Sequence, residues 1–177
     1  IELSHSSDLD LVFIHDAATN QSTDGERPVD NTVFFTRLGQ RIIHILNTQT
    51  PSGMLYEVDM RLRPSGNSGL LASPLYAFEN YQQNDAWTWE HQALVRARFV
   101  CGSASLQEQF EAVRREILCQ HRDREMLREE VVAMREKMRA NLGATGDDFS
   151  LKQDEGGLAD IEFMVQYAVL GWANQHP

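Results

Sequence analysis

Cysteine, lysine and long apolar stretches are scarce in this 177-residue chain, and each shortage excludes a class of protein. The two cysteines, Cys101 and Cys119, are too few for a disulfide framework and too far apart for a Cys-x-x-Cys metal site. Such cysteine usage is typical of a reducing compartment, so we expect a cytoplasmic protein. Because no apolar run reaches about 18 residues, we expect no membrane span.

Lysine occurs only at Lys137 and Lys152, and the net charge is −10. An acidic chain argues against binding nucleic acid or a membrane surface, since both attract basic proteins. The positive charge in the first hundred residues comes only from arginine, at Arg27, Arg37, Arg41, Arg61, Arg63, Arg96 and Arg98. Arginine suits two-pronged contacts with phosphate or carboxylate, although genomic composition explains the same bias.

The first half of the chain alternates strand and helix signals. Residues 7–15 and 54–62 read as strands, separated by a polar loop over 16–31 and a helix capped by Asp30 or Asn31. Gly39 inside that helix indicates close packing. One apolar face of the helix is predicted to consist of Phe34, Phe35, Leu38, Ile42, Ile45 and Leu46.

The second half is predicted to be mainly helical. Ser73-Pro74 reads as the cap and first position of a short helix, and another helix begins near Asp85. Helices follow over 105–120 and 122–142, then a short strand over 149–152. The predicted buried seam of the 122–142 helix comprises Leu127, Val131, Met134, Met138 and Leu142. The inner stripe of a last helix after Gly156-Gly157 comprises Ile161, Val165, Val169 and Trp172.

We therefore predict an α+β protein: a small mixed sheet with flanking helices over residues 1–102, followed by a helical region, a partial bundle, over 103–177. A chain of this length holds one domain, or one domain and part of another.

Carboxylates cluster on the two predicted strands. Asp8 and Asp10, which follow Ser7, point the same way along the first strand, about 6–7 Å apart. On the second strand, Asp59 shares a polar face with Arg61 and Arg63, and it joins the pair if the strands are neighbours. The structural alternative for Asp8 and Asp10 is a solvent-exposed strand start. For the second strand it is an exposed face on which acids and arginines form salt bridges.

Asp160 and Glu162 form a second acid pair of a different kind. On a helix, residues two apart point in different directions, so these carboxylates do not share an ion. Near the N-terminus of the helix, the negative charge of Asp160 interacts favourably with the helix dipole. Asp160 is also a candidate partner for Lys152 or for a neighbouring domain. A structural role is favoured for Arg96, with a phosphate-binding role kept open.

Three strand-borne carboxylates favour Mg²⁺-assisted phosphoryl or nucleotidyl transfer. In that hypothesis Asp8 and Asp10 bridge two metal ions, and Asp59 holds the ion that activates the attacking hydroxyl. Arginines balance the charge of the phosphates.

Four segments carry a family resemblance: SDLDLVF (7–13), YEVDMRLRPSG (56–66), WTWEHQALVRAR (87–98) and GGLADIEF (156–163). Across essentially the whole chain, these segments resemble the bifunctional glutamine synthetase adenylyltransferase/adenylyl-removing enzymes. The 87–98 segment is similar to the AMP-adding, C-terminal half of those enzymes. The removing half usually carries an Asp-Trp-Glu-Arg-Tyr type of sequence there.

The resemblance implies a nucleotidyltransferase-like fold of the polymerase-beta type. It also implies transfer of AMP from ATP to a tyrosine of glutamine synthetase with release of pyrophosphate, using Mg²⁺ and regulated in the full enzyme by glutamine and the PII signal protein. Asp8, Asp10 and Asp59 match the metal and catalytic positions. We assign nucleotide binding to Ser7, Arg61, Arg63, Arg96 and Lys152.

One departure matters. The family signature begins with Gly-Gly just upstream of the segment that starts at Ile1, so we expect a fragment that binds ATP poorly and transfers little AMP. The alternatives are phosphorolytic removal of AMP from modified glutamine synthetase and a non-catalytic module that docks on glutamine synthetase.

Overall fold

The computed structural model describes residues 8–18, 20–54, 56–142 and 150–176. The chain divides into two compact units, Ile1–Asp85 and Ala86–Pro177. The sequence-based division between residues 102 and 103 stays a prediction. The boundary between the two compact units lies before the helix that follows Trp87, because that helix packs on the later helices.

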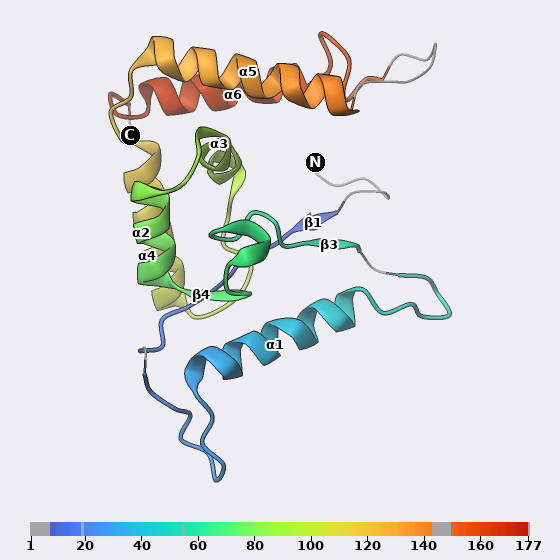
Figure 1. Ribbon diagram of the computed structural model, residues 1–177, viewed down its shortest axis with the longest axis vertical. Coiled ribbons are helices and arrows are strands. Elements are labelled where there is room, and N and C mark those ends of the chain that lie inside the picture. Colours follow the sequence, from blue (N-terminus) through green and yellow to red (C-terminus); the bar gives the residue numbers. More distant parts are fainter. Residues whose placement is uncertain (1–7, 19, 55, 143–149, 177) are drawn as a thin grey trace. The chain divides into compact units, whose positions relative to one another are not determined.

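In the first unit, two small parallel sheets carry the strands (Figure 1). β1 (Leu9–Asp10) pairs with β3 (Val58–Asp59), and β2 (Phe13–His15) pairs with β4 (Ala72–Pro74). The α+β class is confirmed. The single mixed sheet is wrong for the described residues, whose strands form two separate parallel pairs.

The predicted first strand is divided because the chain changes partner between Asp10 and Phe13. Its first part lies beside β3 and its second part beside β4. The predicted 54–62 strand shrinks to Val58–Asp59, since the chain turns at Arg61, where Asp59 binds the backbone. The cap predicted at Ser73 is also wrong, because Ser73 pairs in β4.

Helix α1 (Asn31–Leu46) begins at the predicted cap, where Asp30 accepts hydrogen bonds from the N–H groups of Thr32 and Val33. Gly39 is buried, and a Cβ there would lie 3.0 Å from the Phe13 ring, which confirms the close packing. The predicted apolar face is only partly covered. Its exposed members are Phe34, Leu38, Ile42 and Ile45.

The core of the first unit lies where β2 and β4 meet α1 and α2 (Leu75–Asn84). Phe78 and Ala72 are buried, and so is His15, whose ring stacks on Phe35 with 4.3 Å between centroids. This core holds β2 in place, and β2 follows directly on the strand that carries Asp10.

The second unit consists of α3 (Thr88–Arg96), α4 (Ala104–Leu118), α5 (Arg124–Leu142) and α6 (Leu158–Trp172). α3 packs against the other three, and α5 lies beside α6 (Figure 1). Its buried residues include Leu94, Phe110, Val113, Ile117, Leu127, Val131 and Leu170. The helical prediction is therefore confirmed.

Details of the second unit correct two predictions. Leu127 and Val131 are buried as predicted, but the inner stripe of α6 is wrong, because Ile161 and Val165 are 56% and 53% exposed. α6 is apolar nearly all round, so periodicity does not identify its buried side. The predicted strand over 149–152 is a turn at Leu151 and Lys152, and Phe149 lies outside the described residues.

Within the described part of the chain, no helix combines the length and the apolar character that a membrane crossing requires.

Candidate active site

Two of the predicted carboxylates lie side by side on neighbouring strands. Asp10 and Asp59 are register partners in the β1–β3 pair. Hydrogen bonds from Leu9 N to Glu57 O (2.8 Å) and from Leu11 N to Asp59 O (2.9 Å) fix this register. Register partners project to the same face of a sheet, so the condition on which Asp59 was predicted to join Asp10, that the two strands are neighbours, is met. Asp8 is exposed just before β1.

Both carboxylate oxygens of Asp59 are bound by a single residue, Arg61. The Arg61 backbone N–H donates to Oδ1 at 2.8 Å, and its side-chain Nε donates to Oδ2 at 2.6 Å. A second guanidinium nitrogen forms an ion pair with the same Oδ2. The hydrogen bond from the Arg61 side chain is the main reason that the pKa of Asp59 lies below its usual value.

All three predicted carboxylates act on the Arg61 guanidinium. Its pKa is raised first by the hydrogen bond and charge of Asp59, and then by the charges of Asp10 and Asp8. The sequence predicted that Asp59 and Arg61 share a face, but not that they bind each other. The Asp-x-Arg spacing at the end of a strand was the available signal, since a short turn brings these side chains together.

A divalent-cation site depends both on the ligand atoms of these acids and on their arrangement. In residues 8–18, 20–54, 56–142 and 150–176, no group of three or more His, Cys, Asp or Glu is arranged to hold a metal ion. The donor chemistry nevertheless suits Mg²⁺, because all three side chains offer hard carboxylate oxygens. One of them, Asp59, already binds a positive charge, that of Arg61. The ligand atoms of the three acids therefore suit a divalent cation, and Arg61 is bound to one of these acids, Asp59.

Arg63 forms a hydrogen bond within the turn that follows β3. Its side chain donates to Met60 O at 2.6 Å, and its Nε is buried without a hydrogen-bond partner among the described residues. Ser65 adopts a left-handed conformation (φ 60°) within the same turn. Arg63 thus has a structural contact in addition to its predicted nucleotide-binding role. Ser7 lies outside the described residues.

The other two predicted nucleotide-binding residues lie in the second unit. Arg96 forms an ion pair with Glu162 at 2.6 Å, which accounts for both residues structurally. Lys152 is exposed, and its carbonyl oxygen accepts from Ala159 N at 3.1 Å in the first turn of α6. The proposed partnership of Asp160 with Lys152 is not found, because Asp160 binds other groups.

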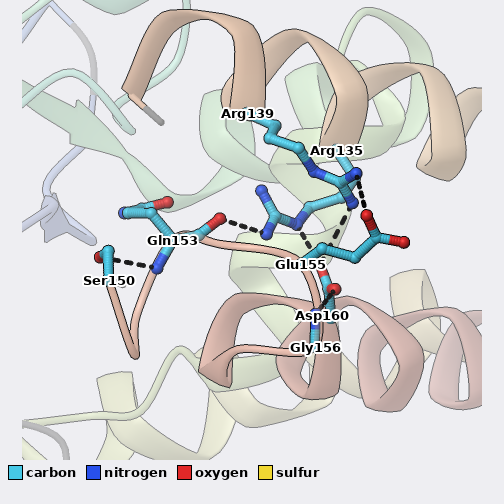
Figure 2. A network of polar contacts seen from close by, with 7 residues as sticks. All are labelled: Arg135, Arg139, Ser150, Gln153, Glu155, Gly156 and Asp160. Atoms are coloured by element: carbon cyan, nitrogen blue, oxygen red, sulfur yellow. Dashed lines mark hydrogen bonds and ion pairs between the residues drawn. The ribbon is translucent and has the colours of Figure 1, made fainter. Parts of the chain in front are cut away.

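Figure 2 shows the network around Asp160. Arg135 Nε donates to Oδ1 at 2.5 Å, and Gly156 N donates to Oδ2 at 2.7 Å. Arg135 also reaches Gln153 O at 2.7 Å. The bond from Gly156 is the first reason, and that from Arg135 the second, that the pKa of Asp160 is lowered. Sequence reasoning missed Arg135, although it lies one turn beyond Val131 on the buried face of α5.

The first unit is thus an α+β structure whose strand ends carry carboxylates and an arginine, and the second is a helical unit. A model of the family "Glutamate-ammonia ligase adenylyltransferase" matches residues 1–113. The chain belongs to this family.

Three relatives named bifunctional glutamine synthetase adenylyltransferase/adenylyl-removing enzyme are similar to the entire chain. The protein of Hahella chejuensis is 61% identical over 183 residues, and those of Pseudomonas putida and Pseudomonas syringae pv. tomato are each 60% identical over 190. In each case the match covers 100% of this chain and 19% of the relative. The chain therefore spans about a fifth of the length of these relatives.

Proposed function

We propose that this chain contributes the catalytic carboxylates for transfer of AMP from ATP to a tyrosine hydroxyl of glutamine synthetase, with release of pyrophosphate. The observation that carries the proposal is the register pairing of Asp10 with Asp59, with Arg61 beside them. Family membership and the names of the relatives support the reaction class. A nucleotidyltransferase-like arrangement of the first unit is part of the same proposal.

The proposal divides the site residues between metal binding and phosphate binding. Asp8, Asp10 and Asp59 hold Mg²⁺, and Arg61 and Arg63 are the candidate phosphate ligands of the first unit. A pair of Mg²⁺ ions, when bound, neutralises phosphate charge and lowers the pKa of the attacking hydroxyl. Ser7, Arg96 and Lys152 remain proposed nucleotide ligands. We extend the proposal, through the resemblance, to regulation of the longer protein by glutamine and PII.

The test is AMP incorporation from labelled ATP into glutamine synthetase by a full-length family protein that carries this sequence. We expect Asp10→Asn and Asp59→Asn each to lower the transfer rate by at least roughly 100-fold, because each removes charge stabilisation from the transition state. Asp24→Asn, which changes an exposed loop acid, is the matched control and keeps the wild-type rate.

The same assay separates the alternative functions. If the Asp10→Asn and Asp59→Asn proteins keep the wild-type rate while folded, the carboxylates are not catalytic and a docking role is favoured. If the protein instead releases AMP from modified glutamine synthetase in the presence of phosphate, and the variants lose only that activity, the chain serves the removing reaction.

A further inference from the structure

Arg61 occupies the carboxylate that the proposed cation needs. Its backbone N–H binds one oxygen of Asp59, and its guanidinium binds the other. A guanidinium and a metal ion both require lone pairs on Asp59 Oδ2, and they repel each other when close. Arg61 and a divalent cation therefore compete for Asp59.

The two sides of this contact differ in exposure. The Arg61 side chain is 72% exposed, whereas that of Asp59 is 14% exposed. An exposed guanidinium is solvated wherever it lies, so leaving Asp59 costs it little. The more buried carboxylate stays in place on β3 and needs a positive partner. Asp59 is therefore fixed in position, whereas the Arg61 guanidinium is free to be replaced by another cation.

From these contacts we propose that Arg61 is an exchangeable counter-ion of the carboxylate cluster. It neutralises Asp59 while no metal is bound, and it is displaced when a divalent cation takes the carboxylate oxygens. The displaced guanidinium then becomes available to a phosphate group, which it binds with two parallel hydrogen bonds. This inference rests on the proposed function, because it assigns Arg61 a second position in the same site.

The charges of the neighbouring acids support this exchange. Asp10 is the register partner of Asp59, so the guanidinium bound to Asp59 lies beside a pair of acidic residues. If it left without a replacement, Asp10 and Asp59 would repel each other as register partners. A divalent cation in place of the guanidinium would offset that repulsion. If Arg61 served only to stabilise the turn after β3, it would instead favour cation binding at Asp59, because it would hold that carboxylate in position.

The test is a titration of the full chain with Mn²⁺, used as a paramagnetic probe for Mg²⁺ and followed by the loss of its free electron-spin signal. We expect Arg61→Gln to bind Mn²⁺ roughly two- to fivefold more tightly than wild type, because the competing cation is gone. Arg41→Gln removes the same charge from an exposed position on α1 and is the matched control for net charge. Circular dichroism checks that each variant is folded.

Each outcome of the titration is decisive. Unchanged or weaker Mn²⁺ binding by Arg61→Gln, or an equal gain in Arg41→Gln, overturns the counter-ion exchange. The proposed metal site fails separately if Asp10→Asn binds Mn²⁺ as tightly as wild type. If wild type binds no Mn²⁺ at millimolar concentration, both proposals fail.

A second measurement follows Arg61 directly in the wild-type chain. In nitrogen-15 spectra, the Nε–H of Arg61 is expected to lose its hydrogen-bonded shift when Mg²⁺ is added. It is expected to shift again when inorganic pyrophosphate joins the Mg²⁺. An Arg61 Nε–H signal that Mg²⁺ leaves unmoved, at concentrations where Mn²⁺ binding is saturated, contradicts the proposed displacement.

Discussion

Arg135 on α5 and Asp160 on α6 join two helices of the second unit through a hydrogen-bonded ion pair at 2.5 Å. The Arg135 side chain is only 8% exposed, and Asp160 also accepts from Gly156 N. The Arg135 side chain therefore connects the buried side of α5 to the loop that carries Gln153 and to the first turn of α6 (Figure 2).

We expect Arg135→Ala to lower the free energy of unfolding by about 2 kcal/mol, because it removes the buried cation that binds Asp160 and the donor to the Gln153 carbonyl. Arg128→Ala, an exposed position on the same helix with a weak pair to Glu125, is the control and should change stability by less than about 0.5 kcal/mol. Urea denaturation measures both. Equal effects of the two variants would show that the ion pair is not a stabilising contact.

A buried amide pair offers a test of packing in the second unit. Gln92 Nε2 donates to Gln166 Oε1 at 2.9 Å, and the two residues are 3% and 7% exposed. Gln92→Leu should lower the free energy of unfolding by about 1–3 kcal/mol, since Gln166 then keeps a buried acceptor without its donor. The Gln92→Leu/Gln166→Leu double variant should recover most of that loss. Additive losses in the double-mutant cycle would argue against the pair.

The buried imidazole of His15 makes stability depend on pH. Burial lowers the pKa of His15, and the charge of Asp16 offsets this only in part. The unfolded chain then binds a proton more readily than the folded chain. The free energy of unfolding should therefore fall as the pH decreases from about 7 to about 5. His15→Phe, which keeps a ring to stack on Phe35, should have a flatter profile over this range. Identical slopes would contradict the prediction.

The loop before α6 should not accept a side chain at Gly157. A Cβ there would lie 2.6 Å from Leu151 O and 2.8 Å from Asp154 O, both backbone atoms. We expect Gly157→Ala to lower the free energy of unfolding by about 1–3 kcal/mol. Gly25→Ala, where a Cβ meets nothing within 4 Å, is the control and should stay within about 0.5 kcal/mol. Thermal melts of the two variants decide the question, and equal melting temperatures would refute it.

Sequence reasoning was most accurate for the helices. Long apolar periodicity and the Asp30 cap predicted α1 and α5 well, because these signals are local. It failed where the outcome depended on partners distant in sequence. No local signal says that the strand changes partner after Asp10, or which side of α6 is covered, because apolar residues lie nearly all round that helix.

In the candidate site, alternation along the strands grouped Asp59 with Asp10 only on the condition that the two strands are neighbours, and the pairing of β1 with β3 supplies that condition. The pairing of Asp59 with Arg61 depended on a turn that the predicted longer strand did not contain. Because the predicted strand continued past Arg61, the sequence also did not indicate that Arg61 and a metal ion compete for Asp59. Arg135 was missed because a charged residue on a buried helix face is visible only once its partner is known.

The parallel pairing of β1 with β3 has a consequence for the order of folding. Asp10 and Asp59 lie roughly fifty residues apart in the chain, and α1 stands between them. Closing so long a loop costs chain entropy before any strand contact repays it, so this pairing is expected to form late. Changes in α1 or its flanking loops should therefore delay assembly of the two acids without touching either of them.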